Sequence, residues 1–174
     1  MSTSFCCLLI ACNNDADSGN DQKLSASRDI FKGIETGDTS KLKSIAPDAI
    51  DHDGPNGEVN SGDSIRDYLA QIHDHVKDLK VEILGDAVSG DYVYTWSKMS
   101  GTALDSTMGF PADQPFEVSG VDVVKFRDGK AVEHWGFVSQ KELRTMRIQQ
   151  MPNATTVKVI MGDTSANRKD SVKK

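Results

Sequence analysis

Asp128-Gly129-Lys130-Ala131-Val132-Glu133-His134-Trp135, near the end of the chain, opens on the strongest hairpin signal in the sequence. Within Arg127-Asp128-Gly129-Lys130 the central pair is Asp-Gly, which two-residue hairpin turns favour because both central residues adopt a positive φ. The flanking runs, Phe116–Phe126 and Ala131–Val138, are rich in valine and aromatic residues, which favour strands. We therefore predict a β-hairpin formed by these two runs.

The residues upstream of the hairpin also follow a strand pattern. From Lys80 to Ala87 the pattern has a period of two, which is typical of a half-buried strand. Ser89-Gly90-Asp91 predicts a turn, and the β-branched and aromatic run Tyr92–Trp96 predicts the next strand. Thr102–Pro115 is long and irregular, so it is either a lid or a wide connection between strands.

Three helices are predicted before these strands. The first ends at Gly37, and the second begins at Thr39 or Ser40 and ends at Pro47. The third begins at Asp63 or Ser64 and has an apolar stripe at helical spacing: Ile65, Leu69, Ile72, Val76 and Leu79. A capping box over residues 139–142 predicts a short closing helix. Helices followed by successive strands indicate an α+β fold with an antiparallel sheet.

Composition excludes several classes of function. The chain has 174 residues, a formal net charge of −6 and a pI of about 5.1, which excludes nucleic acid as a partner because phosphate binding needs a basic patch. No apolar run approaches the roughly 20 residues of a membrane-spanning helix. The cysteines are Cys6, Cys7 and Cys12, so the body of the chain has no disulfide, thiolate nucleophile or cysteine metal site.

The two ends differ from the body. Leu9-Ile10-Ala11-Cys12 closes a short apolar stretch and resembles the lipobox of bacterial lipoproteins, in which the cysteine is acylated. Residues 1–23 are thus expected to form a signal and a polar tether, with Cys12 lipidated and the protein exported and anchored in a membrane, periplasmic or on the cell surface. The alternative is a frayed N-terminus. Residues 151–174 are expected to be a tail, in which Thr155–Met161 either forms a strand or packs loosely.

The order of elements and the motif Asp128–Trp135 resemble the SnoaL-like polyketide cyclase family, which has the nuclear-transport-factor-2-like (cystatin-like) fold. The segment His52-Asp53-Gly54 and Gly62 before the third helix also match, and the resemblance covers residues 24–150. It implies a cone-shaped, curved, mainly antiparallel sheet packed on three helices around a pocket for a small hydrophobic molecule. It also implies a homodimer formed through sheet surfaces. Cyclase-like members carry a catalytic Asp directly after the hairpin Trp, where this chain has Gly136.

Three residues are candidates for acid/base chemistry. Asp122 lies within a predicted strand among apolar residues, where a carboxylate has a raised pKa and can move protons; alternatively it accepts a hydrogen bond from a neighbouring strand. The resemblance places His134 beside the missing acid, although a lone histidine on a strand is more often structural. His52 and Asp53 lie in a loop that reaches the pocket mouth in the family, or they are ordinary turn residues.

The remaining candidates concern ligands. The residues expected to bind the small hydrophobic ligand are His52, Asp53, Tyr68, Trp96, Asp122, His134 and Trp135. The aromatic members are expected to be core or pocket wall. His73-Asp74-His75 is expected to be a solvated face and not a metal site, because residues two apart on a helix point in different directions. No cofactor is expected, since no phosphate-binding loop is present.

Two hypotheses on function follow from different classes. The first is a binding module that holds a small apolar molecule without converting it, and Gly136 favours this hypothesis. The second is a lyase or isomerase that abstracts a proton next to a carbonyl, with Asp122 or His134 as the base and His52 as a helper. Whether the three side chains point into one cavity distinguishes the two.

Overall fold

The structure is a computed structural model that describes residues 14–143, with side chains from residue 18 onwards. The predicted lipobox at Cys12 and the predicted tail over residues 151–174 lie outside the described residues. The elements in chain order are α1 (Asn14–Thr36), the 3₁₀ helix η1 (Thr39–Ser44), β1 (Ile45–Asp51), α2 (Gly62–Gln71), the 3₁₀ helix η2 (Ile72–His75), β2 (Val76–Ser89), β3 (Tyr92–Ala103), β4 (Pro115–Arg127) and β5 (Lys130–Val138).

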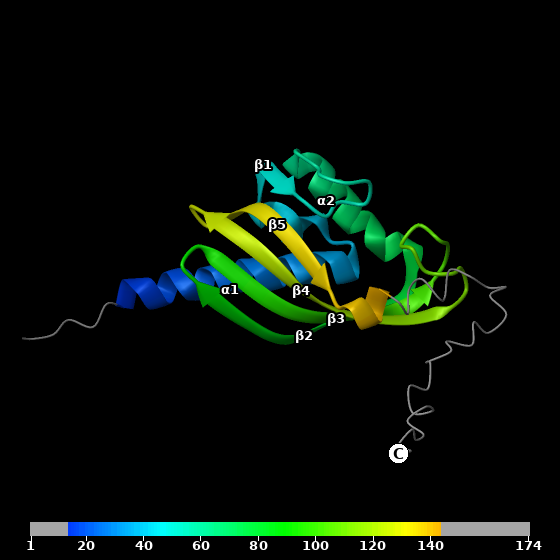
Figure 1. Cartoon of the computed structure of the whole chain (residues 1–174). Helices are drawn as coiled ribbons and strands as arrows, with labels where there is room; N and C mark the ends of the chain where they lie inside the picture. Colours follow the sequence, from blue (N-terminus) through cyan, green and yellow to red (C-terminus); the bar gives the residue numbers. More distant parts are fainter. Residues whose placement is uncertain (1–13, 144–174) are drawn as a thin grey trace, which may run out of the picture.

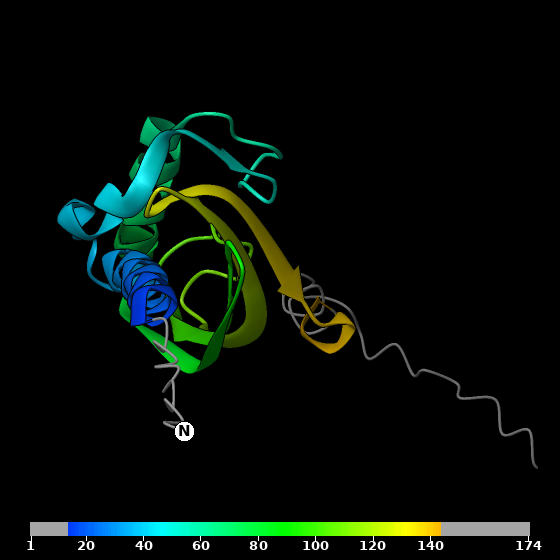
Figure 2. The ribbon, with the colours of Figure 1, turned by 90° about the vertical axis from the view of Figure 1, so that its left-hand side faces the viewer.

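The five strands form one curved sheet in the order β1-β5-β4-β3-β2. The pairs β2–β3, β3–β4 and β4–β5 are antiparallel, whereas β1 pairs parallel with β5. Figure 1 shows α1 lying along the sheet, and Figure 2 shows the sheet curling without closing, with the two α-helices along its open side. The predicted α+β class with a curved, mainly antiparallel sheet is therefore confirmed.

The hairpin that opened the sequence analysis forms as predicted. Arg127 pairs with Lys130, and the two turn residues Asp128 and Gly129 have φ values of 52° and 72°. These positive angles define a turn whose twist matches that of the flanking strands. The hairpin fixes the register of β4 against β5, and this register sets which β4 residue faces each β5 residue across the site described below.

The predicted second helix is wrong beyond its first turn. Residues 39–44 form a 3₁₀ helix, and Ile45 begins strand β1. Pro47 was interpreted as a helix terminator, but it lies within β1, which is an edge strand of the sheet and has β5 as its neighbour. Proline lacks an N–H and is tolerated on edge strands and at irregularities, and the β1–β5 register is irregular between Ile45 and Ile50.

Two further boundaries differ from the predictions. The third helix is capped by Ser61 and ends at Gln71, so the last members of its stripe, Val76 and Leu79, belong to β2. Val76 is buried against residues of the 104–114 loop and of β3 and β4, and this packing determines its conformation. Residues 14–22, expected as a flexible tether, are the first turns of α1.

The closing helix begins where the capping box predicted it. The backbone N–H of Glu142 donates to Ser139 Oγ over 3.2 Å, and residues 140–143 are helical. The residues that would continue this helix lie outside the described range. None of the helices within residues 14–143 is long and apolar enough to cross a membrane.

The core lies between the helices and the concave face of the sheet. One cluster joins Leu42 of η1 to β1, α2 and β5, and another places Phe126 of β4 beneath α1. The loop over residues 104–114 is anchored by Phe110, whose ring stacks on Phe116 at 4.0 Å between centroids. This packing makes the loop part of the wall of a cavity.

Candidate functional site

A cavity of about 550 Å³ lies between the concave face of the sheet and the two α-helices. Its wall is mainly apolar, with contributions from both helices, from the sheet and from the 104–114 loop; examples are Ile30, Phe31, Ile34, Leu69, Met99 and Met108. Polar side chains gather at one end, where β1, β5 and β4 lie side by side. A concave, mostly apolar cavity with a few convergent polar groups is the usual form of a small-molecule site.

At the polar end His134 lies between two carboxylates. Its Nδ1 is 2.9 Å from Asp51 Oδ1, and its Nε2 is 3.2 Å from Asp122 Oδ1. The sheet positions all three residues, because Asp51 is directly paired with His134 and Asp122 lies diagonally across from it on β4. Three adjacent strands thus form an Asp–His–Asp array on the cavity wall.

A second set of hydrogen bonds orients the two carboxylates. Asp51 accepts the backbone N–H of Asp53 over 2.9 Å and the hydroxyl of Tyr68. Ser97 Oγ donates to Asp122 Oδ2 over 3.1 Å, which leaves Asp122 Oδ1 for His134. These bonds fix the orientation of both carboxylates relative to the imidazole.

The array keeps His134 protonated at neutral pH. Burial by itself lowers the pKa of His134, but hydrogen bonds and charge from Asp122 and Asp51 outweigh burial and raise the pKa to about 9. Burial raises the pKa of Asp51, and the hydrogen bond and charge of His134 reverse this effect, so the pKa of Asp51 lies below its ordinary value. The polar end therefore holds an imidazolium between two carboxylates.

This arrangement makes stability depend on pH. The folded-state pKa of His134, about 9, exceeds its ordinary value of 6.5, so its contribution is complete below about pH 6.5 and is lost as the pH rises through 9. We expect the free energy of unfolding to fall by about 2 kcal/mol between these limits; this figure is reduced because 32% of the side chain remains exposed to solvent. Urea unfolding across this pH range measures the change. A His134→Gln variant should lack it, and an equal slope in both proteins would contradict the assignment.

Four of the predicted ligand-binding residues line the cavity, namely Asp53, Tyr68, Asp122 and His134. Three do not, namely His52, Trp96 and Trp135. Neighbouring strand residues point to opposite faces, so Trp135 points away from the cavity that His134 faces. The His52 ring stacks on Trp135 with 4.8 Å between centroids, and Trp96 is 54% exposed on the outer surface.

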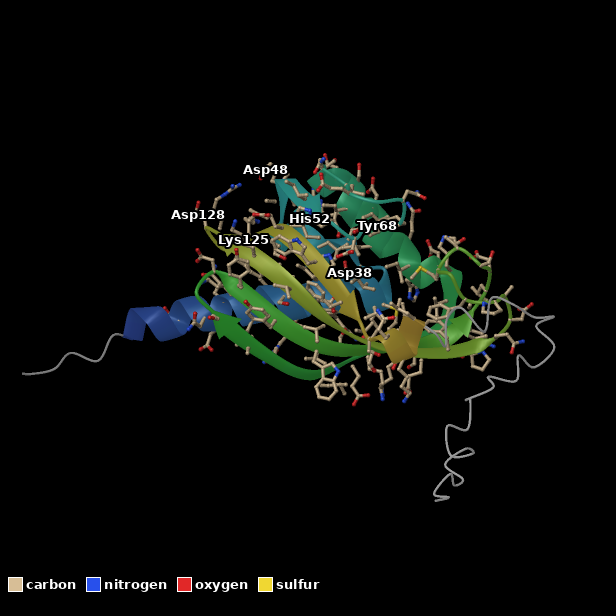
Figure 3. All side chains as sticks on the ribbon, in the orientation of Figure 1. Asp38, Asp48, His52, Tyr68, Lys125 and Asp128 are labelled. Atoms are coloured by element: carbon tan, nitrogen blue, oxygen red, sulfur yellow. The ribbon has the colours of Figure 1, made fainter. Side chains whose placement is uncertain are left out.

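His52 belongs to a polar cluster outside the cavity. Its Nδ1 is 2.9 Å from Glu58 Oε2, and its Nε2 is 3.6 Å from Glu133 Oε2. The other carboxylate oxygen of Glu133, Oε1, binds Lys125. Figure 3 shows His52 and Lys125 beside β5, with Tyr68 coming from α2. The catalytic hypothesis required His52 and Asp122 to point into one cavity, and the structure does not bring them together.

The sequence analysis missed Asp51 and Ser97. Asp51 is the last residue of β1. Because Pro47 was interpreted as the end of a helix, β1 was not predicted, and the position of Asp51 opposite His134 could not be inferred. Ser97 follows the exposed Trp96, and the period of two would have placed it on the inner face if the orientation of Trp96 had been known.

His73 and His75 bind different partners. His73 Nδ1 is 2.8 Å from the backbone oxygen of Glu35, and His75 Nδ1 is 2.7 Å from Asp105 Oδ2. Hydrogen bonds from Thr107 and His75 lower the pKa of Asp105 to about 2, and together they hold the start of the 104–114 loop. Within residues 14–143 no group of three or more His, Cys, Asp or Glu side chains has an arrangement that could hold a metal ion.

Gly136 lies directly opposite Asp122 in the pairing of β5 with β4. Its N–H donates to Asp53 Oδ2 over 2.7 Å, and an added Cβ would meet only ordinary contacts, 3.8 Å from His134 Cε1 at the nearest. This chain lacks the carboxylate that the family resemblance implies at position 136, but Asp122 of the neighbouring strand β4 provides a carboxylate directly opposite Gly136.

Comparison with known proteins identifies the family. The sequence model of the SnoaL-like domain family matches residues 28–134, so the chain belongs to this family. A protein of Jannaschia sp. CCS1 that is assigned as a SnoaL-like polyketide cyclase superposes with a TM-score of 0.65 at 19% identity, covering 76% of this chain and 94% of that one. No curated protein matches the sequence significantly.

Two further solved structures share the fold at lower identity. A protein of Catenulispora acidiphila with a ketosteroid isomerase-like fold has a TM-score of 0.57 at 15% identity, covering 70% of this chain and 90% of that one. An LEH-like epoxide hydrolase of M. tuberculosis has a TM-score of 0.61 at 10% identity, covering 76% and 93%. These likenesses establish the nuclear-transport-factor-2-like fold.

Proposed function

We propose that this SnoaL-like domain binds a small, mainly apolar carbonyl compound in its cavity and transfers a proton beside the carbonyl without a cofactor. The observation that carries the proposal is Asp122 on the cavity wall, hydrogen-bonded to a His134 that Asp51 holds protonated. Gly136 had favoured a non-catalytic domain. That argument loses its force because Asp122 lies directly across the sheet from Gly136. Only Asp122 and His134 of the three acid/base candidates line the cavity, so His52 has no role in the proposed reaction.

Asp122 is the base in this proposal. Its carboxylate takes the proton from the carbon next to the carbonyl, and the electron pair of the broken C–H bond moves onto the carbonyl oxygen as an enolate. The imidazolium of His134 lies beside Asp122 and stabilises this negative charge, and the attraction is stronger in a mainly apolar cavity than in solution. Return of the proton from Asp122 to another carbon of the conjugated enolate, as the electron pair moves back from the oxygen, completes an isomerisation.

Non-catalytic binding is the second candidate, and one observation favours it. Both ring nitrogens of His134 are already engaged, one by Asp51 and one by Asp122. A substrate oxyanion would therefore receive no hydrogen bond from His134 unless one of these bonds breaks. This candidate predicts tight binding with no chemistry.

Deuterium exchange distinguishes the two candidates. The full chain is incubated in D₂O with benzylacetone, a small neutral ketone, and deuterium at the carbons next to the carbonyl is followed by NMR. Proton transfer predicts exchange well above that given by equal concentrations of free acetate and imidazole. Binding of the ketone by calorimetry without faster exchange would overturn catalysis and leave the binding module.

A homodimer is proposed for the outer face of the sheet. Trp96, Val121 and Phe137 are neighbours across β3, β4 and β5, and they are 54%, 37% and 59% exposed. A row of large apolar side chains on one face is typical of a surface that another protein covers, and a second copy is the occupant we propose. Sedimentation should give a dimer, and Trp96→Glu should give monomer; a monomeric parent protein would refute this.

Export as a lipoprotein stays a prediction from the sequence. It depends on Leu9-Ile10-Ala11-Cys12. Radiolabelled palmitate should enter the full chain in a bacterial host, and Cys12→Ala should abolish the label. An equal label in both would place the acylation elsewhere.

A further inference from the structure

The charged residues that line the cavity are mostly acidic. They comprise Asp51, Asp53, Asp122 and Glu133, of which Glu133 has its carboxylate in the outer cluster with His52, and none of the lining residues is Lys or Arg. An apolar wall with one acidic end distinguishes ligands by the charge of their polar group. The charge that faces a ligand therefore depends on which of these carboxylates already has a cationic partner.

Two of the four negative charges are compensated, one by Lys125 and one by His134. Glu133 binds Lys125 Nζ over 2.6 Å, and this pair lies beside the outer cluster that contains His52. The single positive charge of His134 is shared between Asp51 and Asp122. Three carboxylates, those of Asp51, Asp53 and Asp122, thus face one imidazolium, which leaves two negative charges at the polar end.

Asp53 and Asp122 are the carboxylates that a ligand can reach. Asp51 is 3% exposed, and its oxygens already accept three hydrogen bonds. Asp53 binds the uncharged N–H of Gly136, and among residues 18–143 it has no ion-pair partner. Asp122 lies opposite the same glycine, so the two carboxylates flank a position that carries no side chain.

We propose that the mainly apolar carbonyl compound taken by the cavity also carries a protonated amine, and that the cavity rejects anionic molecules of the same shape. The ammonium lies beside Gly136 between Asp53 and Asp122, and its apolar body lies against the helices. A carboxylate or phosphate in this place would face like charges, because none of the lining residues is Lys or Arg and the imidazolium of His134 is already paired with Asp51 and Asp122. The inference rests on the proposed function, because it takes this cavity as the binding site.

Three isosteric probes test the charge preference on the full chain. Para-tert-butylbenzylamine, para-tert-butylbenzyl alcohol and para-tert-butylbenzoate differ only in the polar group, and calorimetry at low salt and near-neutral pH gives each dissociation constant. We expect the amine to bind about tenfold more tightly than the alcohol, and the benzoate about tenfold more weakly than the alcohol. Raising the salt to about 0.3 M should narrow the gap between amine and benzoate.

A pair of variants locates the preference. Asp53→Asn keeps an oxygen acceptor for the Gly136 N–H but removes one charge, so the affinity for the amine should fall about tenfold while that for the alcohol stays within about twofold. Glu117→Gln removes the same charge from an exposed position on β4 and should change neither affinity.

The outcomes separate the inference from the proposed function. Equal affinities for the three probes, or a preference for the benzoate, would overturn the charge preference and leave small-molecule binding in place. Failure of the folded protein to bind any of the three would overturn both. The comparison of probes on the parent protein decides the matter even if Asp53→Asn fails to fold.

Discussion

Replacing Asp122 by Asn is expected to lower the rate of deuterium exchange into benzylacetone by about two to four orders of magnitude. The amide keeps the size of the side chain and an oxygen that accepts from Ser97, but it cannot take a proton. The substitution also removes the charge that His134 Nε2 faces. The rate of exchange should fall because the base is lost, whereas the affinity for the ketone should change little because the ketone is uncharged and the side chain keeps its size.

Two measurements make this result specific. Circular dichroism and calorimetry with benzylacetone establish that the variant is folded and still binds the ketone. Glu117→Gln on the exposed part of the same strand serves as the matched control and should keep the full rate. If Asp122→Asn exchanges as fast as the parent protein, the base is another group and the proposed mechanism is wrong.

The second large effect is expected at Gly62, the first residue of α2. A Cβ at this position would lie 1.9 Å from the backbone oxygen of Ala46 and 2.9 Å from its carbonyl carbon. Neither atom is the end of a flexible side chain, so the start of α2 must move away from β1. We expect Gly62→Ala to lower the free energy of unfolding by about 3 kcal/mol or more.

Gly85 provides the control for this substitution. It lies within β2, and an added Cβ would meet nothing within 4 Å. Gly85→Ala should thus stay within about 0.5 kcal/mol of the parent protein in urea unfolding. Because α2 carries Tyr68, Gly62→Ala should also loosen the hydrogen bond between Tyr68 and Asp51. A loss below about 1 kcal/mol would mean that α2 adjusts easily against β1.

The sheet was largely predictable because its signals are local. Strands β2 to β5 and their turns follow from alternation, from Ser89-Gly90-Asp91 and from Asp128-Gly129, whose conformations depend on nearby residues. Strand β1 was not predictable. It pairs with residues more than 80 positions away, and Pro47 within it indicates a helix end when only the local sequence is considered.

The site was predictable in part for the same reason. Asp122 was found because a carboxylate among the apolar residues of a strand is unusual, and His134 was found because the family resemblance places it beside the missing acid. Asp51 was missed because its contact with His134 is set by the parallel pairing of β1 and β5. Trp96 and Trp135 were placed in the pocket because the period of two gives the alternation along a strand but not which set faces the cavity.

The parallel pairing of β1 with β5 also determines when the polar end of the cavity can form during synthesis. Asp51 leaves the ribosome 83 residues before its partner His134, and β5 must insert between β1 and β4 to complete the sheet. The nascent chain therefore carries an unpaired edge strand and an open apolar cavity until β5 emerges, a state that favours aggregation. The insertion of β5 thus completes the sheet and at the same moment forms the site that binds the ligand.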